Sequence, residues 1–481
     1  MIPDSPYCAC ATPPGIGGIA VIRMSGRGAD EIADRVFRIL RSSGQRIRSV
    51  REMPGYTMAF GRVIDPNDDS IIDECILSVF RAPHSYTGED LIEISCHGGA
   101  AVRQEIIRVL LQNGARAAEP GEFTKNAFLS GKIDLSQAES VMDVISSEST
   151  LALKSAENQL LGALRERIRE TSGELYKIFA KLEMILEFPE HEETPENIGD
   201  SAVRLSAAAI QLRDLAQTYT QGRILREKMN VVLCGVPNSG KSSLLNRLAG
   251  YDRAIVTPVA GTTRDTLEVE TSVEGVPVRL IDTAGLRETM DTVEKIGVSK
   301  AFDAISGADL LLWLISPEES GEEGDLSFFA NVAKSYAERR IGILASKSDL
   351  LSKSSAEEFL CDSLDKIEKM GLSEKIRFSR AISSETGEGI ERIGSEIRSF
   401  YDELGQGTNR SLLLTNSRHY DRVNLAAAHL SEASEILASG QPVEIAGSLI
   451  RTAMDLLGEI TGDHVNETLV AEIFSRFCIG K

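Results

Sequence analysis

The stretch NVVLCGVPNSGKSSLLNRLAG, residues 230–250, decides the fold of the middle of this chain. It reads as an apolar strand, a glycine-rich loop and a helix, and its Gly235-x-x-x-x-Gly240-Lys241-Ser242 matches the phosphate-binding loop pattern. Such a loop needs glycines because backbone N–H groups must surround phosphates at the N-terminus of the helix. The stretch therefore predicts a nucleotide site at the end of a strand.

The sequence around this loop favours an α/β fold. From about residue 221 to 400, short apolar runs alternate with helical stretches. This alternation is typical of a parallel sheet covered by helices on both faces. The longest apolar run, LLLWLI at residues 310–315, has the length of a strand and is far short of the ~18 residues that span a bilayer.

Polar residues at the ends of neighbouring strands extend the nucleotide site. We expect Lys241 to neutralise the β- and γ-phosphates and the Ser242 hydroxyl to ligate Mg²⁺. Thr263 in GTTRD offers another contact to Mg²⁺ and the γ-phosphate, Asp282 in VRLIDTAG can reach Mg²⁺ through water, and Gly285 can donate its amide to the γ-phosphate. The order of these motifs resembles the translation-factor-like class of G proteins.

The motif ILASKSDL predicts which base is bound. Its Asp349 can accept from N1–H and N2–H₂ of guanine, whereas adenine would leave this carboxylate buried and unpaired. Lys347 belongs to the same motif, and AISSETGEGI brings Ser383 and Ser384 beside the base. Ser346 stands where these proteins usually carry Asn, which changes one expected hydrogen bond but leaves the guanine assignment intact.

The residue that orients the attacking water departs from the Ras pattern. Leu286 follows the DTAG sequence where Ras-like proteins carry Gln. Because an aliphatic side chain cannot position water, another group must do so, and Arg287, Glu288 and Glu294 are nearby polar candidates.

Composition limits the classes of protein to which the chain can belong. Its 481 residues predict roughly three domains. The chain has 72 acidic and 52 basic residues, a formal net charge of −20, so it lacks the basic footprint of a sequence-independent nucleic-acid binder. Any RNA is therefore expected to be bound by a small part of the surface of this chain or by a partner protein. Seven scattered cysteines and the absence of a secretory signal predict a cytoplasmic protein.

The pattern of apolar and polar residues along the sequence predicts four segments. Residues 1–118 read as an α+β module, 119–220 as helical, 221–400 as the α/β nucleotide domain and 401–481 as helical again. We therefore expect one discontinuous helical domain into which the α/β domain is inserted.

Two details of the helical segment are specific enough to test. Apolar residues recur at intervals of three and four and predict one helix face; they are Leu153, Ala156, Leu160, Leu164 and Ile168. The acidic stretch EFPEHEETPENIGD at residues 187–200 predicts a solvated loop between helices, with metal binding as the weaker alternative.

Over its whole length the chain resembles the MnmE (TrmE) family. The resemblance includes the nucleotide motifs GVPNSGKSSLLN, VAGTTRD and DTAGLRE. It also includes flanking motifs, which are ATPPGIGGIAVIRMSG (11–26), PHSYTGEDLIEISCHGG (83–99), EPGEFTKNAFLSGKIDLSQAE (119–139) and IFSRFCIGK (473–481). It implies a multidomain α+β protein with an N-terminal α+β folate-binding-like domain, a discontinuous all-helical domain and an inserted α/β Ras-like P-loop GTPase domain.

The resemblance also implies a second site, in the N-terminal domain, which dimerises in this family. Contacts to a tetrahydrofolate derivative would fall on Arg23, Glu93, Lys132 and Lys481. From the residues alone, Arg23 and Glu93 could equally be polar residues on half-buried strands. His97, in a glycine-flanked turn, is a possible neighbour of this site.

For the nucleotide site, the resemblance implies a K⁺ ion in place of an arginine finger. Asn238, Thr257, Val259 and Thr262 match the positions that hold K⁺, and Glu294 matches the residue that orients water. The residues expected to contact GTP are Asn238, Ser239, Gly240, Lys241, Ser242, Ser243, Thr257, Val259, Ala260, Gly261, Thr262, Thr263, Asp282, Thr283, Ala284, Gly285, Lys347, Asp349, Ser383 and Ser384.

In this family, GTP hydrolysis is tied to the modification of the wobble uridine of certain tRNAs. The family implies a homodimer that forms a heterotetramer with an FAD-dependent partner, MnmG (GidA). An aminomethyl or carboxymethylaminomethyl group would be added at C5 of the uridine, with 5-formyl- or methylene-tetrahydrofolate as the carbon source and FAD held only by the partner. The alternative is a regulatory G protein of ribosome assembly or membrane docking.

The cysteines raise two further questions. Cys8-x-Cys10 and Cys96-His97 lack the paired spacing of a zinc site, so core cysteines are the better interpretation. Cys478 precedes Gly480 and Lys481, which do not fit a prenylation box, so no lipid anchor is expected. The family resemblance makes Cys478 a candidate catalytic residue, with a structural role as the alternative.

Overall fold

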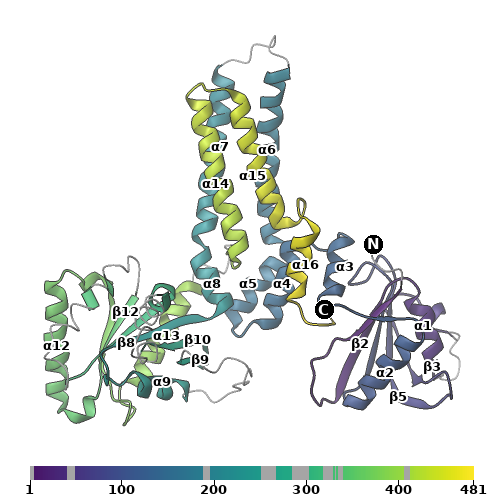
Figure 1. The fold of residues 1–481 in the computed structure, drawn as a ribbon, viewed down its shortest axis with the longest axis horizontal. Helices are drawn as coiled ribbons and strands as arrows, with labels where there is room; N and C mark the ends of the chain where they lie inside the picture. The colour runs from purple at the N-terminus through teal and green to yellow at the C-terminus, as the bar shows by residue number, and fades with distance from the viewer. Residues whose placement is uncertain are drawn as a thin grey trace, which may run out of the picture. The chain divides into compact units, whose positions relative to one another are not determined.

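The computed structural model describes residues 5–40, 49–187, 195–250, 267–283, 303–317, 329–330, 332–333, 340–405 and 412–480. The chain forms two compact units (Figure 1). Unit 1 contains Met1–Ile145, Glu157–Ile210 and Arg422–Lys481, and unit 2 contains Ser146–Ala156 and Gln211–Asp421. In the described part of the chain, no helix combines the length and the apolar character needed to cross a membrane.

Unit 1 begins with a seven-stranded sheet in the order β3-β4-β5-β6-β2-β1-β7. Its neighbouring strands are antiparallel except for the parallel pair β1 and β7. The strands are β1 (Tyr7–Cys10), β2 (Ile19–Ser25), β3 (Phe37–Ile39), β4 (Thr57–Ile64), β5 (Ile71–Phe80), β6 (Leu91–His97) and β7 (Arg116–Ala117).

Alternation along these strands separates two faces of the sheet. One face packs its apolar side chains, among them Ile22, Leu77 and Ile94, against α1 (Ala29–Val36) and α2 (Ala100–Gln112). Arg23 and Glu93 are the next residues in the alternation and therefore lie on the opposite face. Here Tyr7 and Leu91 pack with Phe123 of α3 (Glu122–Leu129).

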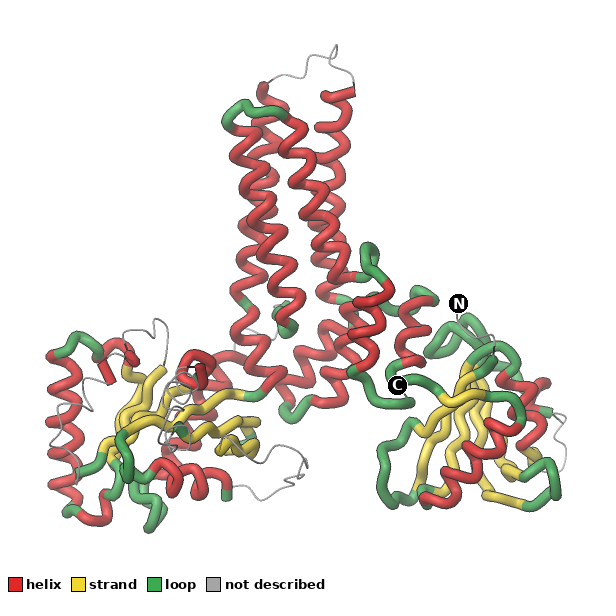
Figure 2. Tube along the Cα trace, viewed as in Figure 1, coloured by secondary structure: helices red, strands yellow, loops and turns green. Residues whose placement is uncertain are grey.

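Besides the helices that pack on the two sheets, the chain has long helices that run side by side (Figure 2). In unit 1, α6 contacts α15, and the Ser434 hydroxyl on α14 donates to the Ala202 carbonyl on α7 at 2.8 Å. The helices that do not pack on either sheet alone are α4 (Leu135–Ser146), α5 (Thr150–Leu160), α6 (Ala163–Glu187), α7 (Pro195–Gln217), α8 (Tyr219–Glu227), α14 (Ser417–Ala438), α15 (Val443–Thr461) and α16 (Glu467–Ser475). Of these, α8 and most of α5 belong to unit 2.

Two expectations about the helices are wrong. The predicted apolar face from Leu153 to Ile168 does not belong to one helix, because the chain breaks between α5 and α6 at Gly162, whose φ is +91°. The predicted 187–200 loop is also shorter, since α7 begins at Pro195. Proline suits the first turn of a helix because the N–H that it lacks would have no helical partner there.

Unit 2 holds a six-stranded sheet in the order β13-β12-β11-β8-β10-β9. All neighbouring pairs are parallel except β10 and β9, so one edge departs from the predicted parallel arrangement. The strands are β8 (Met229–Gly235), β9 (Leu267–Val273), β10 (Val276–Asp282), β11 (Leu310–Ile315), β12 (Arg340–Ala345) and β13 (Ile376–Ala381).

Apolar clusters cover both faces of this sheet, which confirms the α/β prediction. One cluster includes α9 (Lys241–Ala249) and α13 (Ile390–Gly405), and the other includes α12 (Lys353–Lys369). The predicted strand LLLWLI is β11, all six of whose residues are buried. Burial of β11 on both faces explains why its apolar residues form a continuous run.

Candidate functional site

The predicted phosphate-binding loop joins the end of β8 to the start of α9. Gly235 and Gly240 have φ of +140° and +89°, and a Cβ on Gly235 would lie 2.3 Å from the Leu314 carbonyl oxygen. Asn238 also has a positive φ, of +59°. Glycine at 235 is therefore required both by backbone conformation and by the approach of β11.

Lys241, the first residue of α9, is held by the loop that it closes. Its Nζ donates to the carbonyl oxygens of Gly235 at 3.0 Å and Val236 at 2.6 Å, and the residue is 4% exposed. The ammonium is therefore fixed at the mouth of the loop, where a phosphate would lie.

The next residue, Ser242, meets the end of the neighbouring strand β10. Its hydroxyl donates to Oδ2 of Asp282 at 2.7 Å, and Asp282 is fully buried. Thr283 is anchored beside it by a 2.8 Å hydrogen bond from its hydroxyl to the Leu233 carbonyl of β8. A hydroxyl and a carboxylate are oxygen ligands of the kind that Mg²⁺ takes, and Mg²⁺ keeps several waters, so these two residues fit the ion.

The two segments predicted to contact guanine lie together. The N–H of Ser348 donates to the Ile382 carbonyl at 3.1 Å, which joins the segment of Lys347 and Asp349 to that of Ser383 and Ser384. Lys347 has a left-handed backbone, with φ of +57°, and leads into the short 3₁₀ helix Ser348–Leu350. The predicted base contacts are thus brought to one place.

Ser346 and Ser383 also have structural roles that the sequence did not indicate. The buried Ser346 hydroxyl donates to the Ile315 carbonyl at 3.0 Å and so ties the end of β12 to that of β11. The buried Ser383 hydroxyl accepts from the N–H of Thr386 at 3.1 Å and closes its own loop.

Several predicted site residues lie outside the described residues and stay predictions. They include the proposed K⁺ contacts in the 257–262 loop, Thr263, Glu294 and the terminal Lys481. The remainder are Ala260, Gly261, Ala284, Gly285, Leu286, Arg287 and Glu288.

In unit 1, the predicted folate residues Arg23 and Glu93 form an ion pair. They face each other across β2 and β6, and Nη2 of Arg23 lies 2.7 Å from Oε1 of Glu93. The guanidinium also lies 5.5 Å from the ring centres of Tyr86 and Phe123, and its Nη1 donates to the Gly480 carbonyl at 3.4 Å.

Lys132 lies beside the same loop rather than in the ion pair. Its Nζ donates to the Pro83 carbonyl at 2.9 Å, in the β5–β6 connection that also carries Tyr86. His97 is exposed and hydrogen bonds through Nδ1 to Asp73 at 2.7 Å. Among the described residues, neither Lys132 nor His97 forms a hydrogen bond or ion pair with Arg23 or Glu93.

Sequence reasoning missed Tyr86 as part of this site. The Tyr86 hydroxyl and the Thr124 hydroxyl are 2.9 Å apart, and burial is the main cause that raises the pKa of the phenol. The side chain is therefore a neutral hydrogen-bonding group beside Arg23. The only signal in the sequence was its place in the PHSYTGED motif.

The tail after α16 runs against β1 and the start of α3. Ile479 forms a β-bridge with Pro120, and the carbonyl of Cys478 accepts from the N–H of Gly121 at 3.4 Å. Phe477 anchors the tail in an apolar cluster with Phe474. The Cys478 side chain is exposed, so a buried structural role for it is wrong. Cys8 and Cys96 are core cysteines as predicted, whereas Cys10 is only half-buried against the same core.

Gly480 has a backbone that only glycine adopts easily. Its φ is +93°, and a Cβ would lie 2.5 Å from the Cys10 carbonyl oxygen. The close approach to β1 brings the Gly480 carbonyl within reach of Arg23, and Cys478 lies two residues before this contact.

Comparison with known proteins gives matches over nearly the whole chain. Residues 6–132 match the family model described as the GTP-binding protein TrmE N-terminus, and residues 135–478 match the MnmE helical domain. Similarity to a solved structure, the G domain of the T. maritima FeoB iron transporter, is weak. It has a TM-score of 0.25 at 25% identity over 36% of this chain and 98% of that chain, and carries no argument.

Full-length relatives are much closer. The chain is 38% identical over 483 residues to the tRNA modification GTPase MnmE of Acetivibrio thermocellus, and 39% identical over 485 residues to that of Carboxydothermus hydrogenoformans. Both alignments cover 100% of this chain and 100% of the relative. The chain belongs to the MnmE family of tRNA modification GTPases.

Proposed function

We propose that unit 2 hydrolyses GTP with Mg²⁺ held by Ser242 and Thr263, and that Asp282 reaches the ion through water. The observation that carries this proposal is the 2.7 Å hydrogen bond between the side chains of Ser242 and Asp282, directly beside the buried Lys241. When bound, Mg²⁺ would neutralise charge on the phosphate oxygens. Lys241 would bind the β- and γ-phosphates, and Asp349 would select guanine.

The proposal extends to K⁺ and to Glu294. Asn238, in the exposed part of the loop and with a positive φ, is the one proposed K⁺ contact among the described residues. K⁺ there would stabilise charge that develops between the phosphates, and Glu294 would orient the attacking water in place of Leu286. Thr257, Val259 and Thr262 complete the proposed set.

The proposed role of unit 1 is to bind a tetrahydrofolate derivative at the Arg23–Glu93 pair. A pterin has an amine and amide edge that the Glu93 carboxylate can bind, and Arg23 and Lys132 are suited to carboxylate groups of the ligand. A folate derivative would supply a one-carbon unit. Cys478 is exposed on the adjoining tail, which supports a place for it near the modification chemistry.

The proposed reaction adds an aminomethyl or carboxymethylaminomethyl group at C5 of the wobble uridine in certain tRNAs. It would need an FAD-dependent partner of the MnmG (GidA) type, bound to a homodimer of this chain. The net charge of −20 supports a partner that carries much of the tRNA-binding surface.

Two measurements test the proposal. GTP hydrolysis by the purified protein should be faster in K⁺ than in Na⁺ at equal ionic strength, and equal rates would remove the role of K⁺. Mass spectrometry of tRNA nucleosides from a deletion strain should show loss of the C5 group. Unchanged wobble uridines would instead favour a regulatory G protein of ribosome assembly.

A further inference from the structure

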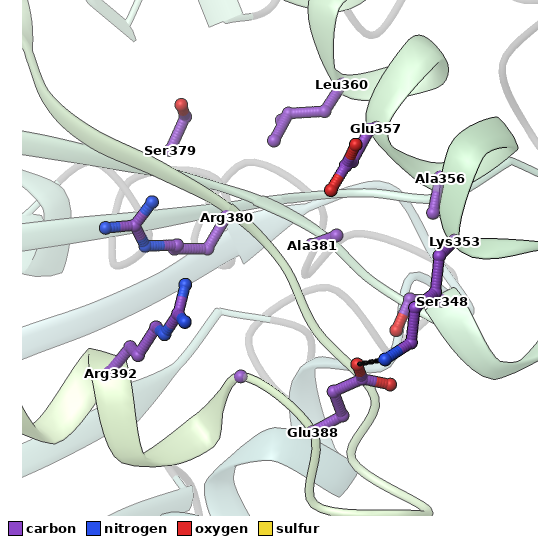
Figure 3. Close-up of a pocket in the computed structure, with 11 residues that line it drawn as sticks. Ser348, Lys353, Ala356, Glu357, Leu360, Ser379, Arg380, Ala381, Glu388 and Arg392 are labelled. Carbon is purple, nitrogen blue, oxygen red and sulfur yellow. Dashed lines mark ion pairs between the residues drawn. The ribbon is translucent and has the colours of Figure 1, made fainter.

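Unit 2 contains a pocket that is separate from the phosphate-binding loop. It lies between α12, β13 and the first turn of α13, has a volume of about 380 Å³, and is called the arginine pocket below (Figure 3). This volume is within the range of small-molecule sites, roughly 300–1,000 Å³. None of the residues that line it belongs to the phosphate-binding loop or to the expected GTP contacts.

Two arginines from different elements meet in the arginine pocket. Arg380 lies on β13 and Arg392 on α13, and the Arg392 side chain points toward Arg380 (Figure 3). Among the residues that the structure describes, neither guanidinium has an ion-pair or hydrogen-bond partner, and Nε of Arg380 is buried without an acceptor. A buried donor without a partner is destabilising, and two like charges in one pocket repel each other. An anion bound between the two arginines would relieve both effects.

Among the described residues, the arginines are the cations of the pocket that have no ion-pair partner. Lys353 pairs with Glu388 at 3.3 Å, so these two charges offset each other. Glu357 is the remaining carboxylate, and the buried Ser348 hydroxyl has no partner within the described residues. Within the part of unit 2 that the structure describes, two unpaired guanidinium groups and one unpaired carboxylate therefore line the pocket, so its lining carries a net positive charge in a strongly acidic chain.

We propose that the arginine pocket binds a phosphate group between Arg380 and Arg392. Guanidinium groups present planar pairs of N–H donors that match phosphate oxygens, and two of them can hold a dianion from two sides. Glu357 and Ser348 can hydrogen bond to a hydroxyl group next to the phosphate, as on a ribose. The phosphate has two possible sources, a free phosphate compound or the backbone of the tRNA.

Binding is tested on the full-length protein saturated with GDP and Mg²⁺, so that the phosphate-binding loop is already filled. Inorganic phosphate is titrated by calorimetry into wild type, Arg380→Gln and Arg392→Gln. We expect saturable binding to wild type, weakened about tenfold in each variant by the loss of charge-assisted hydrogen bonds. Arg392 is exposed on α13, so its replacement leaves the fold intact even if that of Arg380 does not.

The control is Arg398→Gln, which removes the same charge from the same helix outside the pocket, where Arg398 pairs with Asp402 at 2.8 Å. Phosphate affinity should be unchanged in this variant. Equal weakening in Arg398→Gln would overturn the proposal, because general charge would then explain the binding. Absence of saturable phosphate binding by wild type, together with tRNA affinity unaffected by either pocket variant, would overturn it as well.

Binding of labelled tRNA, measured by fluorescence anisotropy over a range of salt concentrations, distinguishes the two sources. Weaker tRNA binding by the two pocket variants, with a shallower salt dependence, supports an RNA phosphate as the ligand. Loss of phosphate binding with unchanged tRNA binding supports a free phosphate compound. GTP hydrolysis by the variants is measured in parallel, and should equal the wild-type rate because neither arginine is among the expected GTP contacts.

Discussion

The Ser242 hydroxyl donates a hydrogen bond of 2.7 Å to the Asp282 carboxylate, although 40 residues separate the two in the chain. Parallel pairing of β8 with β10 makes this possible, because it sets Asp282 opposite Leu233 near the carboxyl ends of both strands. Ligands of open α/β sheets bind at that edge. The two oxygens are thus held in place by the sheet itself.

Asp282→Asn is expected to lower the rate of GTP hydrolysis by about 100-fold or more, since metal stabilisation of the transition state amounts to several kcal/mol. The loss should be partly restored by high Mg²⁺, which a rate titration would detect. The matched control is Asp402→Asn on α13, an exposed carboxylate paired with Arg398, which should keep the wild-type rate. Full activity of Asp282→Asn would contradict the proposed Mg²⁺ site.

Gly480→Ala is expected to disturb tRNA modification and to leave GTP hydrolysis unchanged. The new Cβ would lie 2.5 Å from the Cys10 carbonyl, so the tail and Cys478 must shift. A shift of about 1 Å can reduce a rate roughly 100-fold. Modified nucleosides are quantified by mass spectrometry after reaction with the partner enzyme.

Gly440→Ala is the control for this variant. Gly440 also has a left-handed backbone, with φ of +70°, but open space surrounds the position of its Cβ. Gly440→Ala therefore measures the effect of backbone strain alone, because the tail is not displaced in this variant. Equal loss of modification in both variants would show that the contact of Gly480 with β1 is unimportant.

Arg23→Gln is expected to weaken binding of 5-formyl-tetrahydrofolate by about tenfold or more, because a hydrogen bond to a charged group is worth ~1.5–3 kcal/mol. The control is Arg62→Gln, which removes another cross-strand pair of the same sheet, with Glu74 at 2.6 Å. That pair is more exposed, and Glu74 lies four residues along β5 from Ser78, the residue opposite Glu93, so folate affinity should persist. Equal affinities of Arg23→Gln and wild type would contradict the proposed site.

The buried thiols of unit 1 should make the protein less stable at alkaline pH. Burial raises the pKa of Cys8 and Cys96 to about 11 and that of Cys75 to about 12, from 9.0. Above pH 9 the unfolded chain loses these protons more readily than the folded one, so the free energy of unfolding falls as pH rises from about 9 toward 12. Below pH 9 this contribution to stability is fully present.

Urea unfolding at several pH values tests this prediction. Cys75→Ala should lower stability at neutral pH, because it leaves a cavity, but it should flatten the alkaline decline. Cys361→Ala, at an exposed position, should leave the decline unchanged. An identical alkaline slope in Cys75→Ala and wild type would rule out the thiol as a cause.

The sequence predicted those parts of the fold that depend on local pattern. The strand LLLWLI and the loop before Lys241 are recognisable because burial and backbone conformation act on neighbouring residues. The break at Gly162 was missed, since a glycine within a helical pattern is often tolerated. The antiparallel edge strand β9 was missed because strand direction depends on pairing and not on composition.

The site residues also fall into those predicted from local motifs and those that only tertiary contacts reveal. Arg23 and Glu93 were expected from motifs, and the structure brings them together, whereas Tyr86 and the Gly480 carbonyl join them only through tertiary contacts. Ser346 shows a further limit. Its hydroxyl donates a hydrogen bond to the Ile315 carbonyl, and this bond depends on where β11 ends relative to β12.

The contact of Arg23 with Gly480 also sets an order of events during synthesis. The two residues are 457 positions apart. At ribosomal speeds of about 5–20 residues per second, Arg23 emerges about 20 to 90 s before Gly480 is translated. The N-terminal sheet can therefore fold on the ribosome long before its tail arrives, and a nascent or prematurely terminated chain would present Arg23 and Glu93 without the tail that carries Cys478.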